Sequence, residues 1–141
     1  MKIFILEDEP LLKDLLVSYI QDFTEFTVAG VSDNGSEALD CIARTHPNII
    51  IADIQLPGVN GLEILDRVKQ SNPDTKVILY SGEFAPRKIQ YAYEHDADGL
   101  LQKGRSMTEL SSAIDTVSRG DRYFSEEALD IVSLFKENGS A

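Results

Sequence analysis

NIIIADIQLPGVNGLE, residues 48–63, is the segment that is most informative about the fold of this chain. It begins with a run of isoleucines, reaches a carboxylate at Asp53, and then turns through Leu-Pro-Gly at residues 56–58. A continuous apolar run of strand length is typical of a strand in a parallel sheet that helices cover on both faces. A carboxylate at the end of such a strand costs free energy unless a cation or another partner compensates its charge. This segment therefore predicts a buried strand over residues 49–53 that ends in a functional acid.

Apolar segments of strand length alternate along the chain with amphipathic helical patterns. The predicted strands cover residues 2–6, 26–31, 49–53, 76–80 and 99–102. Helices are predicted over residues 10–23, 35–45, 84–95 and 125–136, and two more begin after the N-caps Asn60 and Ser106. Five βα units in strict alternation predict an α/β fold, a doubly wound (βα)5 sandwich around one five-stranded parallel sheet.

The length and the charge of the chain limit its function. A chain of 141 residues can form one domain with a core and a short tail. The 24 acidic residues outnumber the 13 basic residues, and the net charge of −11 repels nucleic acid, so these residues alone are not expected to bind DNA. The sequence contains neither an apolar run that could span a membrane nor a signal peptide, so the expected location is the cytoplasm, with no membrane partner.

Polar side chains that can take part in chemistry follow four of the five predicted strands. Glu7 and Asp8 follow the first strand, Asp53 ends the third, Ser81 follows the fourth, and Lys103 follows the fifth. The carboxyl ends of parallel strands meet at one edge of the sheet, where α/β proteins bind their ligands. These side chains are therefore expected to form one site.

The residue types in this set indicate phosphoryl chemistry assisted by a metal ion. Glu7, Asp8 and Asp53 are hard oxygen ligands, and carboxylates held this close need a cation such as Mg²⁺. Lys103 can neutralise a phosphoryl group, and the hydroxyl of Ser81 can donate a hydrogen bond to one of its oxygens. Asp53 can then attack phosphorus and hold an acyl phosphate, which is nucleophilic catalysis by a carboxylate.

The segments at this edge resemble those of a known family, the receiver domain of two-component response regulators. The segments are FILEDEP at residues 4–10, IIIADIQLPGVNGLEIL at 49–65, VILYSG at 77–82 and ADGLLQKG at 97–104. The resemblance covers residues 1–120. It implies a flavodoxin-like fold with the strand order 2-1-3-4-5.

The resemblance also implies roles for individual residues. A sensor histidine kinase would phosphorylate Asp53, and Mg²⁺ would be held by Glu7, Asp8, Asp53 and the backbone carbonyl of Gln55. Beyond gaining and losing its own phosphoryl group, the chain would not be an enzyme. The family has an aromatic residue three positions before the lysine that turns inward on phosphorylation. Leu100 occupies this position here, which leaves the site intact and puts the aromatic readout in doubt.

The C-terminal part resembles the junction of regulators of the NarL/LuxR class. SRGDRYFSEEALDIVSLF, residues 118–135, is similar to the stretch in which a linker leads to a helix-turn-helix DNA-binding domain. The expected organisation is a receiver domain over residues 1–120 and a linker-like helical tail over residues 121–141. DNA would be bound only by a C-terminal domain absent from this chain, and phosphorylation would favour a homodimer through the fourth and fifth helices or the first and fifth.

Two other classes of protein are weighed against this interpretation. A stand-alone receiver or a pseudo-receiver would act through protein contacts, the latter without phosphate. A metal-dependent phosphatase on a similar sheet would need a second aspartate two residues after the nucleophile as a general acid. Gln55 occupies that position, which counts against a phosphatase.

Overall fold

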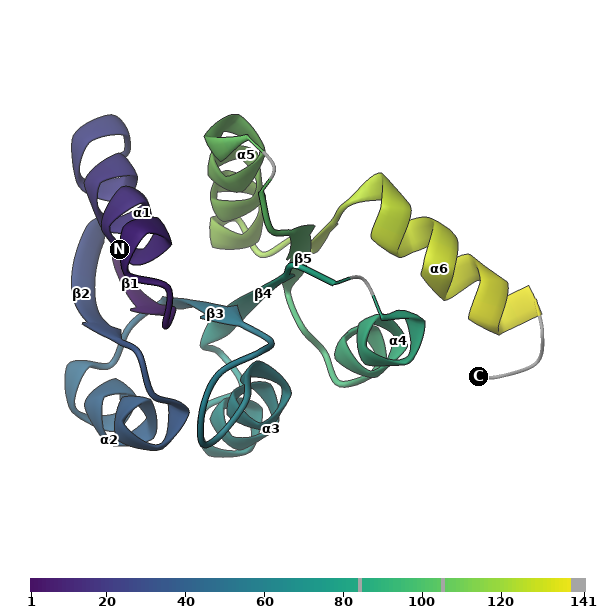
Figure 1. Cartoon of the computed structure of the whole chain (residues 1–141), viewed down its shortest axis with the longest axis horizontal. Helices are drawn as coiled ribbons and strands as arrows, with labels where there is room; N and C mark the ends of the chain where they lie inside the picture. The colour runs from purple at the N-terminus through teal and green to yellow at the C-terminus, as the bar shows by residue number, and fades with distance from the viewer. Residues whose placement is uncertain (84, 105, 138–141) are drawn as a thin grey trace.

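The computed structural model describes residues 1–83, 85–104 and 106–137. The described residues form one parallel six-stranded sheet in the order β2-β1-β3-β4-β5-β6, with helices on both faces (Figure 1). The strands are β1 (Lys2–Leu6), β2 (Thr27–Ser32), β3 (Ile49–Asp53), β4 (Lys76–Ser81), β5 (Gly99–Gln102) and β6 (Tyr123–Phe124). The helices are α1 (Pro10–Phe23), α2 (Gly35–Thr45), α3 (Gly61–Ser71), α4 (Pro86–Glu94), α5 (Met107–Ser118) and α6 (Glu126–Glu137).

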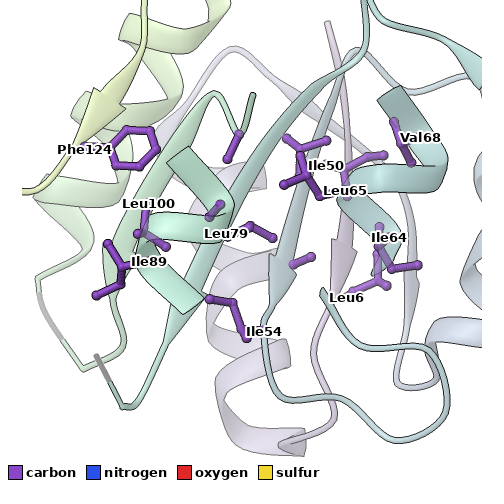
Figure 2. Packing of buried hydrophobic residues seen from close by; sticks show 14 of the residues in the cluster. Leu6, Ile50, Ile54, Ile64, Leu65, Val68, Leu79, Ile89, Leu100 and Phe124 are labelled. Carbon is purple, nitrogen blue, oxygen red and sulfur yellow. The ribbon is translucent and has the colours of Figure 1, made fainter. Parts of the chain in front are cut away.

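Two apolar layers hold the helices to the sheet. Helices α1 and α5 cover one face, where Leu16 and Ile114 are among the buried side chains, and α2, α3 and α4 cover the other (Figure 1). Figure 2 shows part of this second layer, in which Leu100 and Phe124 lie at the β5 and β6 end. None of the described helices has both the length and the apolar character needed to cross a bilayer.

Strand β3 lies in the middle of the sheet and is buried along its whole length. Its side chains alternate between the layers, so that Ile49 and Ile51 pack toward α1 and α5 while Ile50 packs toward α3. Each buried isoleucine contributes roughly 1.5 to 3 kcal/mol to folding. Both faces of β3 therefore require apolar residues, which explains the run of isoleucines, and the strand holds Asp53 in place at its end.

The alternation of strands and helices confirms the predicted α/β fold, and α1, α2, β1, β3 and β5 have the predicted bounds. The predicted caps are also present, since Asn60 accepts a hydrogen bond from the backbone N–H of Glu63 and Ser106 accepts one from that of Glu109. Helix α4 begins at Pro86, and residue 84, where its start was predicted, lies outside the described residues.

The prediction of a five-stranded sheet was wrong in the number of strands. The order 2-1-3-4-5 is present, but β6 adds a sixth strand, pairing parallel to β5 with Phe124 opposite Leu100. The reason is local: Gly120 has a positive φ of 93°, which turns the chain after α5 back toward the sheet. A strand of two residues has no periodicity from which it could be predicted.

Helix α6 packs against α4 (Figure 1). Arg122, just before β6, binds the C-terminal part of the chain to the end of α4 and the residues after it. The guanidinium of Arg122 donates hydrogen bonds to the backbone carbonyls of Ala97 (3.1 Å) and Tyr93 (2.8 Å). It also lies over the rings of Tyr93 and Phe124, which meet edge to face. One side of α4 is thereby covered by the C-terminal part of the chain.

Candidate functional site

The carboxyl edge of the sheet brings the predicted side chains together. Glu7 is fully buried, Asp53 is 2% exposed, and Lys103 reaches both of them from the end of β5. The ammonium of Lys103 lies 2.7 Å from Asp53 Oδ2 and 3.1 Å from Glu7 Oε1. One amine thus serves as the counter-charge for two buried carboxylates.

The acidic residues have the arrangement of a hard-cation site. One carboxylate oxygen from each of Glu7, Asp8 and Asp53 lies within 4.8 Å of the other two. Glu7 and Asp53 are buried and Asp8 is exposed, so the cluster opens to solvent on one side. Carboxylates combined with access for water are the environment that Mg²⁺ prefers in proteins. The donor set therefore fits a magnesium ion.

Asp53 is held in a fixed orientation by two neighbours. Its Oδ1 accepts a hydrogen bond from the backbone N–H of Gln55 at 2.9 Å, while its Oδ2 contacts Lys103. Burial raises the pKa of Asp53, and the charge of Glu7 adds to the rise, although Lys103 and the N–H of Gln55 act in the opposite direction. The ionised carboxylate is thus less stable here than in water. Gln55 thus contacts Asp53 through its backbone N–H. That the backbone carbonyl of Gln55 binds the metal stays a prediction.

The pKa of Glu7 is shifted in the opposite direction to that of Asp53. Burial acts to raise the pKa of Glu7, but hydrogen bonds from the backbone N–H of Glu9, from Tyr80 and from Lys103 together lower it. In turn, the two carboxylates keep Lys103 charged, since their hydrogen bonds raise its pKa despite its burial. Glu7 and Lys103 are therefore a charged pair at neutral pH.

Ser81 lies at the same edge with its hydroxyl engaged in the following loop. Its Oγ donates to the backbone carbonyl of Glu83 at 2.6 Å and accepts from the N–H of Glu83 at 3.2 Å. To contact a group on Asp53, the Ser81 hydroxyl would have to leave the carbonyl of Glu83. Ser81 is thus the predicted site residue that links the site to the loop before α4.

The loop after Asp53 packs against the start of α2. The backbone N–H of Gly35 approaches the carbonyl of Pro57 at 3.4 Å, and Gly58 in the turn has a positive φ of 75°. A Cβ on Gly35 would lie 1.7 Å from the carbonyl oxygen of Val59, so only glycine fits beneath this loop. Close packing of backbone against backbone therefore fixes the position of the loop.

Sequence reasoning missed one residue of this site, Tyr80. Its side chain is buried at the end of β4, with 6% exposure. Its hydroxyl, however, donates a hydrogen bond to Glu7 Oε1 at 2.7 Å, although the two residues are 73 positions apart. The available signal was chemical, because a tyrosine in a buried strand needs a partner for its hydroxyl.

The raised pKa of Asp53 predicts how stability depends on pH when no metal is present. Above the ordinary aspartate pKa of 3.8, Asp53 is ionised in the unfolded chain while the folded chain still retains its proton. The free energy of unfolding should therefore fall as the pH rises from that value through the folded-state pKa. Urea unfolding at a series of pH values from about 4 upward in metal-free buffer measures the fall.

Asp53→Asn should reduce this pH dependence, whereas Asp115→Asn, at an exposed position of α5, should leave it unchanged. The loss of stability that comes from Glu7 lies at lower pH, because its folded-state pKa is below the ordinary value of 4.5. Equal pH dependence in the wild type and Asp53→Asn would contradict the assignment to Asp53.

Comparison with known proteins gives a consistent match. The family model described as the response regulator receiver domain matches residues 3–115. A proposed transcriptional regulator of Pseudomonas aeruginosa is 34% identical over 144 residues, which cover 99% of this chain and 67% of that protein. The nitrate/nitrite response regulator NarL of Escherichia coli is 25% identical, over 93% of this chain and 61% of NarL. This chain thus spans about two thirds or less of these relatives.

Solved structures show the same similarity. A DNA-binding response regulator of the LuxR family from Staphylococcus aureus superposes with a TM-score of 0.79 at 32% identity, covering 82% of this chain and 97% of that one. A two-component response regulator of the LuxR family from Aurantimonas has a TM-score of 0.88 over 96% of both chains. At 21% identity, this second similarity concerns the fold alone.

Proposed function

Because this chain belongs to the family of response regulator receiver domains, in its NarL/LuxR branch, we propose that Asp53 accepts a phosphoryl group from the phosphohistidine of a sensor histidine kinase. The observation that carries the proposal is the contact of Asp53 with Lys103 beside Glu7 and Asp8. An anionic nucleophile, a fixed cation and an acidic cluster are the groups that phosphoryl transfer needs.

The chemical step is an attack of an Asp53 carboxylate oxygen on phosphorus. The new O–P bond forms as the P–N bond to the histidine breaks, and the electron pair of that bond stays on the imidazole nitrogen, which takes a proton from water. Lys103 already contacts Asp53 and would neutralise the oxygens of the transferred group. The chain would gain and later hydrolyse its own phosphoryl group, and beyond these two steps it would not be an enzyme.

The proposed cofactor is Mg²⁺, held by Glu7, Asp8, Asp53 and the backbone carbonyl of Gln55. When bound, it would supply positive charge to the phosphoryl oxygens. The chain's own part is to keep two buried carboxylates and one exposed carboxylate close together. Lys103 offsets part of their mutual repulsion.

Ser81 would connect phosphorylation to a change of shape. The phosphoryl group would attract the Ser81 hydroxyl away from the carbonyl of Glu83, which frees the loop before α4. Leu100 supports a readout that does not use an inward-turning aromatic at this position. It is fully buried, and its carbonyl accepts a hydrogen bond from the N–H of Ser125, at the start of α6.

The output would be transcriptional and would lie outside this chain. The names of the relatives describe response and transcriptional regulators, and the chain covers 67% and 61% of two of them. We therefore assign residues 1–120 to the receiver domain and 121–141 to the linker toward a helix-turn-helix domain. Phosphorylation would favour a homodimer through α1 and α5, since α6 covers α4 and α1 exposes Leu11, Leu15 and Phe23.

Treatment with acetyl phosphate and Mg²⁺ tests the function directly. The intact mass should increase by one phosphoryl group in the wild type and in Asp115→Asn, and it should not change in Asp53→Asn. Sedimentation of the same chain with and without beryllofluoride, a phosphoryl mimic, measures the homodimer. A wild type that takes up no phosphoryl group but still binds a protein partner would instead identify a pseudo-receiver.

A further inference from the structure

Tyr80 joins the acidic cluster to the apolar layer beneath it. Its ring packs in the layer under α1 and α5, and on the sheet it is the direct neighbour of Asp53. A phenylalanine could fill the same space, because the ring accounts for the packing. The hydroxyl is therefore the part of Tyr80 that needs a separate explanation.

The hydroxyl of Tyr80 is one of three donors that surround the Glu7 carboxylate. Tyr80 donates to Oε1 at 2.7 Å, the backbone N–H of Glu9 donates to Oε2 at 2.9 Å, and Lys103 Nζ lies 3.1 Å from Oε1. Lys103 also lies 5.7 Å from the centre of the Tyr80 ring. The carboxylate is thus fixed at both oxygens, and Tyr80 donates to one member of the charged pair and lies near the other.

These donors would respond differently to a group arriving at Asp53. Lys103 is shared between Glu7 and Asp53, and a phosphoryl group would compete for it. Tyr80 donates to Glu7 from below the site, within the buried layer. Its hydrogen bond can therefore persist while Lys103 changes partner.

We propose that Tyr80 is a positioning residue for the divalent-cation site, whose hydroxyl orients the Glu7 carboxylate toward the cation that Asp8 and Asp53 share. A glutamate side chain has more rotamers than an aspartate, so ordering it on cation binding has an entropic cost. The bond to Tyr80 orders it in advance. Groups that orient metal ligands from behind typically change metal affinity by about 10- to 100-fold. The inference rests on the proposed function and adds a residue to it.

A titration of the full, unphosphorylated chain with Mg²⁺, followed by the amide NMR signals around Asp53, tests the proposal. Tyr80→Phe should raise the Kd for Mg²⁺ about tenfold. Tyr123→Phe is the matched control, because it also removes a hydroxyl from a tyrosine packed on the same layer, and it should leave the Kd unchanged. An unchanged Kd in Tyr80→Phe would overturn the proposal.

A double-mutant cycle separates positioning from a general effect on the fold. If Tyr80 acts through Glu7, Tyr80→Phe should have no further effect on the Kd in a Glu7→Ala background. An equal loss in both backgrounds would show that Tyr80 acts otherwise, and it would overturn the proposal while leaving the phosphorylation of Asp53 intact. A wild type that binds no Mg²⁺ would overturn the proposed cation site and this inference together.

Discussion

Lys103→Ala is expected to abolish phosphorylation of Asp53 and to lower the free energy of unfolding by about 3 kcal/mol. Lys103 Nζ lies within 3.1 Å of two carboxylates, and the side chains of Glu7 and Asp53 are 0% and 3% exposed. Without the ammonium, these two charges remain buried with no cation beside them. The raised pKa of Lys103 means that its stabilising contribution is complete at neutral pH and is lost only in strongly alkaline solution.

Lys69→Ala provides the matched control for this variant. Lys69 is also largely buried, and its ammonium lies 2.7 Å from Asp98. It also donates a hydrogen bond to the backbone carbonyl of Thr75, just before β4. Its loss should destabilise the chain without preventing phosphorylation. Urea unfolding and the intact mass after acetyl phosphate treatment measure the two effects, and Mg²⁺ should restore part of the stability of Lys103→Ala. Normal phosphorylation of Lys103→Ala would refute the role given to this residue.

Gly35→Ala is expected to destabilise the fold by about 3 kcal/mol, which for a domain of this size lowers the Tm by roughly 10 °C. The added Cβ would meet the Val59 carbonyl oxygen at 1.7 Å and the Val59 carbonyl carbon at 2.7 Å. Both are backbone atoms, so the whole loop after Asp53 must shift. Because this loop carries Gln55, whose N–H holds Asp53, phosphorylation should also become slower.

Gly82→Ala is the control for the glycine substitution. A Cβ at Gly82 would lie 3.9 Å from Lys103 Cδ, which is an ordinary contact. Its stability should stay within about 0.5 kcal/mol of the wild type. Thermal unfolding of both variants and the wild type measures the difference in Tm. An unchanged Tm in Gly35→Ala would show that the loop can shift at little cost in free energy.

The site was predictable because its parts end recognisable strands. The run of isoleucines before Asp53 and the alternation of strands and helices are local signals, and the winding rule then places Glu7 and Lys103 at the same edge. Three features had no such signal. Strand β6 is too short for a pattern, and the hydrogen bond from Tyr80 to Glu7 joins residues 73 positions apart. The hydroxyl partner of Ser81 also depends on the loop conformation.

Strand β6 has a consequence for the behaviour of shorter fragments of this chain. The match to the family ends at residue 115, before β6, although β6 supplies hydrogen-bonding partners to β5 along the margin of the sheet. A fragment cut there would lose the β6 partners of Gly99 and Leu100 and the side chain of Phe124 that packs in the same layer as Leu100. An unprotected margin of this kind recruits strands from other molecules, and aggregation follows. The C-terminal segment, by pairing with β5, should therefore protect the chain from aggregation through this edge of the sheet.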